Sequence, residues 1–273
     1  MNEIEDPRVT LVRQRTLNAA QQRSLGWETK RAKMLTATDI PTILGVNPYQ
    51  TADELILRKL GKSEKFEGNV FTQWGNMFED VAMFQVYKKI FDITSEIIQV
   101  GLVDHPSIPF LGASPDFILP QGKIVEIKCP FKRHVCGIVP EHYYPQVQLQ
   151  LEVCDLDIAD FFECEFHKQM SDTIPGYEFI NGNTFQTEYH AEPITGTVIT
   201  KNNESMVWYL ERCSVVSVHR DREWFNRHLP AMTVFYNTLM DYKNSPEKLD
   251  VLYRTTYSKK TLPVSSEVLF IDI

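Results

Sequence analysis

The stretch Leu111–Pro130, LGASPDFILPQGKIVEIKCP, decides the fold of this chain. Residues 110–119 and 123–129 are rich in β-branched, aromatic and other apolar side chains, and Pro-Gln-Gly at 120–122 is a turn signal between them. We therefore predict two antiparallel strands joined by a tight turn. Apolar side chains occur on both faces of this hairpin, which indicates a sheet covered by helices on both sides.

Four polar side chains share one face of the predicted hairpin. Counted outward from the turn, Asp116 lies opposite Glu126, and Ser114 lies opposite Lys128. Directly opposed residues have Cβ atoms roughly 4.5–5.5 Å apart, and like charges at that distance are destabilising. Two carboxylates held this way in an apolar sheet need a cation between them. Lysine alone would serve, but two acids and one lysine also describe a divalent-metal site with a charged helper.

The composition is that of an ordinary globular protein. The chain has 273 residues, of which 43% are hydrophobic, so it can bury a sizeable core as one large domain or two small ones. No apolar run approaches the roughly 18 residues of a membrane span, and the N-terminal sequence MNEIEDPRVT lacks the basic and apolar regions of a signal peptide. Five cysteines without a CxxC pair predict reduced thiols in an intracellular protein.

The charge and the motifs argue against several classes of function. A net charge of −8 argues against non-specific coating of nucleic acid, so a DNA substrate would need positive groups concentrated at the site. The seven histidines show none of the HxH, HExxH or Cys/His spacings that signal a metal site. The sequence has no G-x-S-x-G elbow and no Walker A loop, which argues against a serine hydrolase and against ATP-driven chemistry.

The rest of the sequence predicts helices and strands around the hairpin. The clearest helix is Trp74–Phe91, in which large apolar side chains recur with helical spacing. A second helix, Glu141–Val153, carries Pro145 in its first turn, and the long helix Arg220–Lys243 contains Pro230. We also predict an edge strand at Ile93–Val103, a strand at Ile158–Phe166, loops and a hairpin at Ser171–Glu204, helix or strand at Met206–Ser217, a basic loop at Phe131–Val139 near a DNA backbone, and a short helix that Thr38 caps and that ends near Gly45.

Ser-Pro-Asp at 114–116, followed after nine residues by Glu-Ile-Lys at 126–128, resembles the motif of the PD-(D/E)XK nuclease superfamily. An R…T block, a G…E pattern and a Tyr-x-x-Gln-x-Gln element lie around it, in an order similar to that of the phage lambda exonuclease and YqaJ-like viral recombinase family. The resemblance covers residues 27–166 and rests beyond them on the long helix. It implies an α/β (α+β) fold with a restriction-endonuclease-like core, in which helices flank both faces of a central mixed β-sheet.

The resemblance also implies catalytic roles for particular side chains. The leading hypothesis is phosphodiester hydrolysis in which Asp116 and Glu126 hold Mg²⁺, or Mn²⁺ in its place, together with the main-chain carbonyl of Ile127. Such a metal lowers the pKa of a bound water and stabilises charge on the phosphate. Lys128 would position or activate that water, and Gln146 would orient the nucleophile or the lysine.

Further residues of the family blocks surround this centre. Glu79, from the G…E pattern, is expected close to the metal, as a direct ligand or through a water. Arg31 and Thr38 keep the spacing of the family's arginine and serine, with threonine in place of serine, and would grip a terminal 5′-phosphate. Ser114 would donate to a phosphate oxygen. From the residues alone, a solvated basic turn with an ordinary helix cap explains Arg31 and Thr38 as well.

By resemblance, the chain is a 5′→3′ exonuclease for double-stranded DNA ends in recombination, repair or viral DNA processing. The family also implies a single-strand annealing protein as partner, a homo-trimer that threads DNA, and a virus-encoded protein inside a host cell. A nicking or restriction-type endonuclease of the same fold and a non-catalytic DNA-binding protein remain as alternatives. We expect residues 1–23 to be an N-terminal helical extension, 24–245 a single nuclease domain and 246–273 a C-terminal tail.

Overall fold

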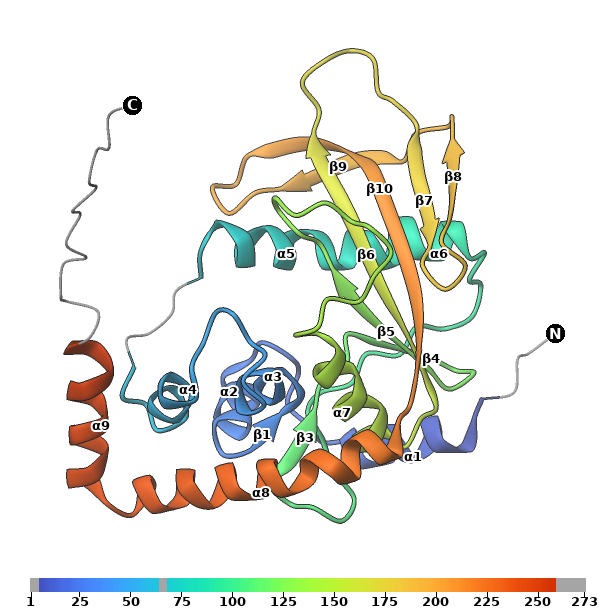
Figure 1. Cartoon of the computed structure of the whole chain (residues 1–273). Helices are drawn as coiled ribbons and strands as arrows, with labels where there is room; N and C mark the ends of the chain where they lie inside the picture. Colours follow the sequence, from blue (N-terminus) through green and yellow to red (C-terminus); the bar gives the residue numbers. More distant parts are fainter. Residues whose placement is uncertain (1–4, 64–67, 259–273) are drawn as a thin grey trace, which may run out of the picture.

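The predicted hairpin forms one edge of a seven-stranded mixed sheet (Figure 1). The computed structural model describes residues 5–63 and 68–258. Neighbouring strands follow the order β4-β5-β6-β10-β7-β8, and β9 pairs with β10. The strands of this sheet are β4 (Phe117–Leu119), β5 (Lys123–Lys128), β6 (Ile158–Lys168), β7 (Tyr177–Asn181), β8 (Gln186–His190), β9 (Thr195–Ile199) and β10 (Ser205–His219).

The turn of the hairpin agrees with the prediction. The register pairs Phe117 with Val125 and Leu119 with Lys123, so three residues form the connection. Gly122 ends this connection with a φ of +85°, a backbone conformation that residues with a side chain rarely adopt. The glycine is therefore what permits the tight return of the chain into β5.

A break at Ser114–Asp116 divides the predicted strand 110–119 in two, so the prediction of one continuous strand is wrong. Its first part belongs to a separate three-stranded sheet of order β1-β3-β2, made of β1 (Leu35–Thr36), β3 (Leu111–Ala113) and β2 (Val103–Asp104). Pro115 accounts for the break, because proline has no N–H to donate to a ladder. Asp116 is consequently not a ladder partner of Glu126.

Two long strands, β6 and β10, form the middle of the large sheet. β5 runs parallel to β6 from Lys123 beside Ile158 to Lys128 beside Glu163. β6 is antiparallel to β10, which is also paired with β7 and β9. The predicted strand at 158–166 is confirmed, 206–217 is strand, and the hairpin predicted within 171–204 is formed by β7 and β8.

The predicted edge strand at Ile93–Val103 is wrong. In this segment only Ile98 forms a bridge, to Ile118 of β4, and β2 begins at its last residue. Asp92 has a φ of +48°, which turns the chain just before the segment. β4 is also only three residues long, so it offers almost no edge for a further strand to follow.

Eleven helical segments surround the two sheets in the described part of the chain. They are α1 (Pro7–Thr16), α2 (Leu25–Ala32), the 3-10 turn η1 (Ala37–Asp39), α3 (Ile40–Ile43), α4 (Ala52–Lys59), α5 (Val70–Val81), the π-helical segment η2 (Ala82–Tyr87), α6 (Lys88–Ile90), α7 (Tyr144–Cys154), α8 (Arg222–Lys243) and α9 (Pro246–Ser258). The helix predicted at 74–91 is confirmed as α5, η2 and α6 in succession. Pro145 lies in the first turn of α7, and Pro230 lies inside α8, as predicted.

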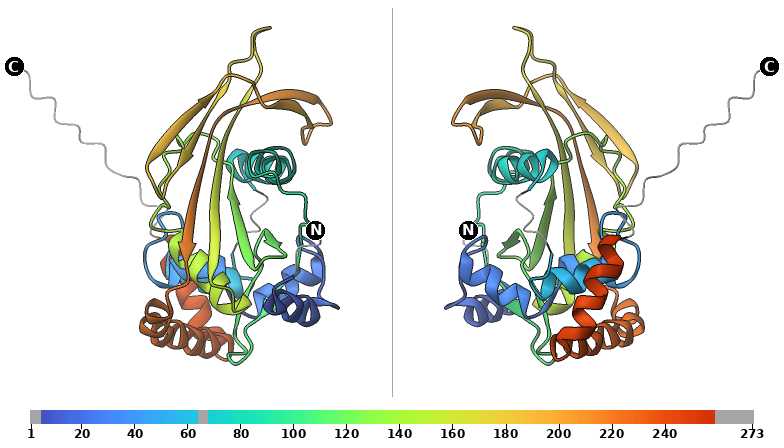
Figure 2. Two further views of the ribbon diagram at one scale, coloured as in Figure 1. Left: turned by 90° about the vertical axis from the view of Figure 1, so that its right-hand side faces the viewer. Right: turned by 90° about the vertical axis from the view of Figure 1, so that its left-hand side faces the viewer.

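Helices cover both faces of the large sheet, as the hairpin predicts (Figure 2). On one face Ile118, Ile124 and Phe161 belong to a core that includes residues of α1, α4, α7, α8 and α9. On the other face Phe117 and Val125 belong to a second core with α5 and η2. The predicted fold class, a central mixed sheet flanked by helices, is confirmed.

The predicted C-terminal tail begins with a helix. Residues 246–258 form α9, which contacts α4 and α8 and buries Leu249 and Leu252. Residues 259–273 of that predicted tail lie outside the described residues. At the other end of the chain, α1 buries Val9 and Val12 in the core that contains α7.

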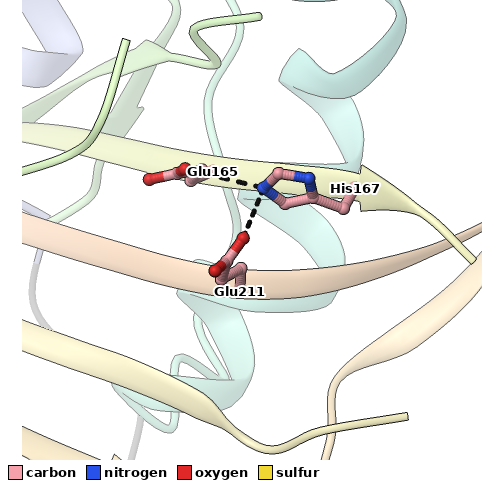
Figure 3. A group of neighbouring side chains, drawn as sticks. All are labelled: Glu165, His167 and Glu211. Atoms are coloured by element: carbon pink, nitrogen blue, oxygen red, sulfur yellow. Dashed lines mark ion pairs between the residues drawn. The ribbon is translucent and has the colours of Figure 1, made fainter. Parts of the chain in front are cut away.

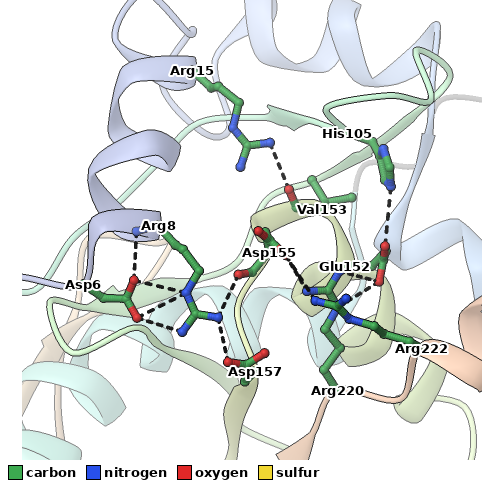
Figure 4. Close-up of polar contacts among 10 residues, drawn as sticks. All are labelled: Asp6, Arg8, Arg15, His105, Glu152, Val153, Asp155, Asp157, Arg220 and Arg222. Atoms are coloured by element: carbon green, nitrogen blue, oxygen red, sulfur yellow. Dashed lines mark hydrogen bonds and ion pairs between the residues drawn. The ribbon is translucent and has the colours of Figure 1, made fainter.

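Ion pairs fasten α1 to the corner where α7 leads into β6 (Figure 4). Arg8 pairs with Asp6 at 2.8 Å and with Asp157 at 2.6 Å. On the other side of the corner, Arg220 pairs with Glu152 at 2.7 Å, and the Arg220 side chain is only 8% exposed. Pairs that are shielded in this way are screened less by solvent than exposed ones. They fix the C-terminal end of α7, the helix whose first turn carries Gln146.

Candidate active site

Glu126 lies on β5 and is almost completely buried, with 1% of its surface exposed. Its Oε1 accepts hydrogen bonds from Lys128 Nζ and from Gln146 Nε2. Its Oε2 accepts a hydrogen bond from Gln150 Nε2 at 2.7 Å. Gln146 and Gln150 are one helical turn apart on α7, so both amides reach the same carboxylate. Three donors hold this carboxylate in one orientation.

The third glutamine of α7 has a structural role. Gln148 donates to the main-chain oxygen of His219 at 2.8 Å and accepts from the main-chain N–H of Asp221 at 2.7 Å. It therefore links α7 to the start of α8 and faces away from Glu126. Gln150 was not among the predicted site residues, and the signal that could have found it is its four-residue spacing from Gln146.

Asp116 reaches the same place from the turn before β4. Its Oδ2 accepts a hydrogen bond from the main-chain N–H of Ile127 at 2.8 Å. Burial raises the pKa of Asp116 well above its usual value, and the charges of Glu126 and Glu79 raise it further, while Lys128 acts in the opposite direction. The crowding of carboxylates that the sequence predicts is thus present, although the contact does not run through the strand ladder.

Glu79 brings a third carboxylate to this centre from α5. Burial raises the pKa of Glu79, while the charges of Arg23 and Lys128 act to lower it. The Nη2 atom of Arg23 lies 2.7 Å from Glu79 Oε2. Arg23 precedes α2 and has a φ of +66°, a conformation that few non-glycine residues adopt. No sequence pattern had singled out Arg23.

Lys128 carries a positive charge into the cluster. Burial acts to lower the pKa of Lys128, but the charges of Glu126 and Asp116 outweigh burial and raise that pKa above its usual value. Lys128 Nζ also lies 5.1 Å from the centre of the Tyr143 ring, where a cation is attracted to the ring face. The side chain therefore stays protonated at neutral pH. This suits a group that donates to water or phosphate, and not one that accepts a proton.

The residues predicted to bind phosphate lie together beside this cluster. Arg31 Nη2 donates to Thr38 Oγ1 at 2.8 Å, and the guanidinium lies 4.2 Å from the centre of the Trp27 ring. Trp27 Nε1 donates in turn to Ser114 Oγ at 2.9 Å. One indole ring thus connects the Arg31–Thr38 pair to the turn that carries Asp116. Sequence reasoning gave Trp27 no role, because a single tryptophan after a polar segment has no distinguishing pattern.

The predicted helix cap at Thr38 is wrong. Thr36 caps η1 instead, in a reciprocal arrangement with Asp39, whose Oδ2 accepts from the Thr36 N–H at 2.8 Å. Because Thr36 takes the capping position, the exposed hydroxyl of Thr38 is available to Arg31.

A buried ion group supports the position of Arg31. The Asp39 side chain is inaccessible to solvent, and it pairs with Lys59 at 2.5 Å and with Arg58 at 2.7 Å. Burial acts to raise the pKa of Asp39, but the charges of Lys59 and Arg58 outweigh it and hold that pKa well below its usual value. Lys59 Nζ also donates to the main-chain oxygen of Arg31 at 2.9 Å. The backbone that carries the predicted phosphate-binding arginine is therefore anchored to the protein interior.

The basic loop Phe131–Val139 faces acidic side chains of the sheet. Arg133 pairs with the buried Glu163, and His134 Nδ1 lies 2.8 Å from Glu165 Oε1. Two of its three basic side chains are therefore engaged with carboxylates, which reduces their capacity to bind a DNA backbone.

The donor set around Asp116 fits a hard divalent cation. Asp116 and Glu126 offer carboxylate oxygens, the main chain of Ile127 offers a carbonyl oxygen, and Glu79 adds a third carboxylate nearby. Oxygen donors of this kind suit Mg²⁺ and Mn²⁺. Because the carboxylates repel each other, a bound cation would stabilise them together. The arrangement is therefore chemically suited to bind a divalent metal beside a phosphate.

Comparisons of the sequence with known proteins find a match to one viral family model and relatives among viral proteins. Residues 26–157 match the model of the YqaJ-like viral recombinase domain. The uncharacterized protein R354 of Acanthamoeba polyphaga mimivirus is 24% identical over 306 aligned positions, which cover 86% of this chain and 55% of that protein. Protein D345L of African swine fever virus (isolate Tick/Malawi/Lil 20-1/1983) is 25% identical over 162 positions, which cover 48% of this chain and 46% of that protein. The chain thus spans about half the length of the curated relatives it matches.

Two solved structures share the fold. The alkaline exonuclease LHK-Exo from Laribacter hongkongensis superposes with a TM-score of 0.54 at 20% sequence identity, over 86% of this chain and 100% of that chain. The structure of LHK-Exo in complex with dAMP gives 0.53 at 19% identity, with the same coverage. At this level of identity the similarity establishes the fold alone, which is restriction-endonuclease-like. Within the described residues, no helix combines the length and the apolar character needed to cross a membrane.

Proposed function

We propose that the chain is a divalent-metal-dependent deoxyribonuclease that acts at the ends of duplex DNA, on the premise that residues 26–157 match the YqaJ-like viral recombinase domain. One observation carries the proposal: Lys128 and the α7 glutamines hold the buried Glu126 carboxylate beside Asp116. Crowded carboxylates cost stability in a protein that only binds DNA. In a hydrolytic centre the same crowding serves to bind a metal.

The chemistry follows from what each side chain can offer. Asp116, Glu126 and the main-chain carbonyl of Ile127 would hold Mg²⁺, with Mn²⁺ as a substitute. When bound, the metal supplies an acidified water and compensates the charge of the phosphate. Lys128 donates from its ammonium group to that water or to a phosphate oxygen, and so stabilises negative charge as the phosphodiester bond breaks. Gln146 keeps the Glu126 carboxylate in place through its amide donor.

Glu79 takes a supporting part in this proposal. It is fixed by Arg23 at 2.7 Å and lies close enough to Asp116 for its charge to act on the pKa of that residue. We assign Glu79 a contact with the metal through a bound water. Glu79 thereby adds negative charge that favours metal binding, and Arg23 limits the repulsion that this charge causes.

The direction of digestion is proposed from the Arg31–Thr38 pair. A guanidinium beside a hydroxyl is suited to a terminal phosphate, which carries more charge than a phosphodiester. Trp27 touches Arg31 on one side and Ser114 on the other, so a 5′-phosphate held there would lie one indole ring from the catalytic turn. Ser114 would donate to a phosphate oxygen of the same strand. This arrangement favours a 5′→3′ exonuclease.

The biological setting is proposed by analogy with the family. It comprises recombination, repair or viral DNA processing in a host cell, a single-strand annealing protein as partner, and a homo-trimer around the DNA. The viral origin of the curated relatives supports a virus-encoded protein.

One assay tests the reaction and its direction together. Linear duplex DNA with 5′-phosphate ends, linear duplex with 5′-hydroxyl ends and covalently closed circles are incubated with the protein and Mg²⁺, with and without EDTA. We expect mononucleotides from the linear duplexes, faster release from 5′-phosphate ends, intact circles and no reaction in EDTA. The variant Asp116→Asn should be inactive. The matched control Glu188→Gln, which neutralises an exposed carboxylate on β8, should be as active as the parent protein.

The alternatives predict different products. Nicked or linearised circles would favour an endonuclease of the same fold. DNA binding without cleavage, in Mg²⁺ and in Mn²⁺, would favour a non-catalytic DNA-binding protein and would refute the proposal.

A further inference from the structure

A second group of metal-ligating side chains lies on the sheet, beyond the end of β5. Glu165 and His167 belong to β6, and Glu211 belongs to β10 (Figure 3). One carboxylate oxygen of each glutamate and a ring nitrogen of the histidine all lie within 4.8 Å of one another. The group is separate from the candidate active site. β5 ends with Lys128 beside Glu163, and β6 continues past that point to Glu165 and His167.

A β-bulge brings Glu211 to this group. In the register of β10 against β6, Leu210 pairs with Phe166 and Arg212 pairs with Glu165, so Glu211 is an extra residue without a ladder partner. Leu210 and Phe166 belong to the core beneath α5, which places them on the face opposite to Glu165. In a regular strand, Glu211 and Arg212 would point to opposite faces of the sheet. The bulge lets Glu211 point to the same face as Glu165.

The histidine nitrogen lies at ion-pair distance from two carboxylates but forms no hydrogen bond of good geometry with either. His167 Nε2 lies 2.5 Å from Glu211 Oε2 and 3.5 Å from Glu165 Oε1. This nitrogen is inaccessible to solvent and has no hydrogen-bond partner among the described residues. A buried polar atom of this kind calls for a specific explanation, and an ion is one of the few that are available.

Three outer contacts support the arrangement. His134 Nδ1, from the loop after β5, lies 2.8 Å from the same Glu165 oxygen that faces His167. The other oxygen of Glu165 accepts from the main-chain N–H of Val135 at 3.2 Å, and Glu165 is 6% exposed. The His167 ring stacks on Tyr209 with the ring centres 5.7 Å apart. Contacts that orient ligands in this way strengthen metal sites.

We propose that Glu165, His167 and Glu211 form a site for a single Zn²⁺ ion, with His134 as an outer contact of Glu165. One imidazole and two carboxylates are a three-donor set that zinc accepts in tetrahedral geometry, with a water in the fourth position. Imidazole nitrogen also favours zinc over the magnesium that an all-oxygen site prefers. The bound ion joins β6 to β10, and Glu165 connects it to the loop at 131–139 through His134 and Val135. Because this loop directly follows the strand that carries Glu126, zinc would fix the chain at the exit of the active site.

Calorimetric titration of Zn²⁺ into the full-length protein tests the site. The Asp116→Asn variant is used in excess Mg²⁺, so that the oxygen-rich cluster does not contribute to the zinc signal. We expect one equivalent of Zn²⁺ to bind. Introducing His167→Ala into this variant should weaken zinc affinity by at least about tenfold. Even the loss of a residue that only orients a ligand lowers metal affinity by about 10- to 100-fold. His190→Ala, which removes an exposed histidine 3.9 Å from a glutamate on β8, is the matched control and should leave zinc affinity unchanged.

Two further measurements keep the result decisive. Glu211→Gln preserves the shape of a half-exposed side chain and should also weaken zinc binding, which covers the case in which His167→Ala does not fold. Zn²⁺ should raise the Tm of the parent protein and of His190→Ala, but not that of Glu211→Gln. Equal zinc binding with and without His167, or no zinc binding at all, would overturn the proposal. His167 would then be an imidazolium ion between two glutamates.

Discussion

Replacing Asp39 by asparagine tests whether the buried ion group holds the proposed phosphate-binding segment. Asp39 and Lys59 are both nearly inaccessible, with side-chain exposures of 0% and 2%. Asparagine keeps the shape and one acceptor oxygen but leaves the Lys59 ammonium group without a full countercharge. Removing one partner of a buried pair costs about 3–5 kcal/mol.

An independent bound on this cost comes from the lysine itself. The variant can escape the buried charge by folding with Lys59 neutral. At pH 7 this costs about 4.6 kcal/mol, because the proton must be removed about 3.4 units below a pKa of about 10.4, at 1.36 kcal/mol per unit. At pH 9 the same escape costs only about 1.9 kcal/mol. The loss of unfolding free energy in Asp39→Asn should therefore be about 3–4.6 kcal/mol at pH 7 and should shrink at pH 9.

Urea denaturation at both pH values measures this difference, and a thermal scan at pH 7 should show a Tm lower by about 6–18 °C. Lys59→Met and the double variant complete a double-mutant cycle, in which Asp39→Asn with Lys59→Met should regain much of the lost stability. A double variant as unstable as Asp39→Asn, or a loss that does not depend on pH, would refute the reasoning.

The difference in stability between the parent protein and Asp39→Asn should also shrink in acid. The pKa of Asp39 is held below its unfolded value, so its ion pairs stabilise the parent protein above pH of about 4. This contribution is lost as the pH falls from there toward the folded pKa. Asp39→Asn lacks this titration, so its stability should fall less steeply with acid than that of the parent protein.

Three further predictions concern activity. Glu126→Gln should abolish cleavage while circular dichroism shows a folded protein, and full activity would refute the assignment. Lys128→Ala should lower kcat by about 100- to 1,000-fold with little change in DNA affinity, because the lost charge acts on the transition state. Lys132→Ala, on the adjacent loop, is the control. A defect of Lys128→Ala in DNA binding alone would contradict the proposed role. Arg31→Gln should reduce the preference for 5′-phosphate over 5′-hydroxyl ends by at least about tenfold. The control Lys33→Gln removes an exposed charge nearby, and an equal loss in both variants would indicate only a change in net charge.

Much of the candidate active site could be predicted because its residues lie in short blocks with strong local patterns. The alternation of β5 places Glu126 and Lys128 on one face of the sheet. Helical spacing places Gln146 and Gln150 on one side of α7. Asp116 was placed correctly beside Glu126 for a reason that was partly wrong, because Pro115 ends the ladder and the contact runs through the N–H of Ile127.

Other residues left no local signal in the sequence. Arg23 reaches Glu79 from the segment before α2, and Trp27 reaches Ser114 across a large sequence separation. Glu211 depends on a one-residue shift in the pairing of β10, which alternation cannot indicate. Each of these contacts is decided by tertiary packing, which sequence periodicity does not encode.

The end of the family match at residue 157 has a practical consequence for work with this protein. β6 begins at the next residue and pairs with every residue of β5. A fragment cut to the recognisable segment would therefore expose the unpaired edge of the very strand that carries Glu126, and such edges promote aggregation. The segment that matches the family model is therefore shorter than the folded unit that contains Glu126. Biochemical work on the candidate active site needs the strands and helices that follow residue 157.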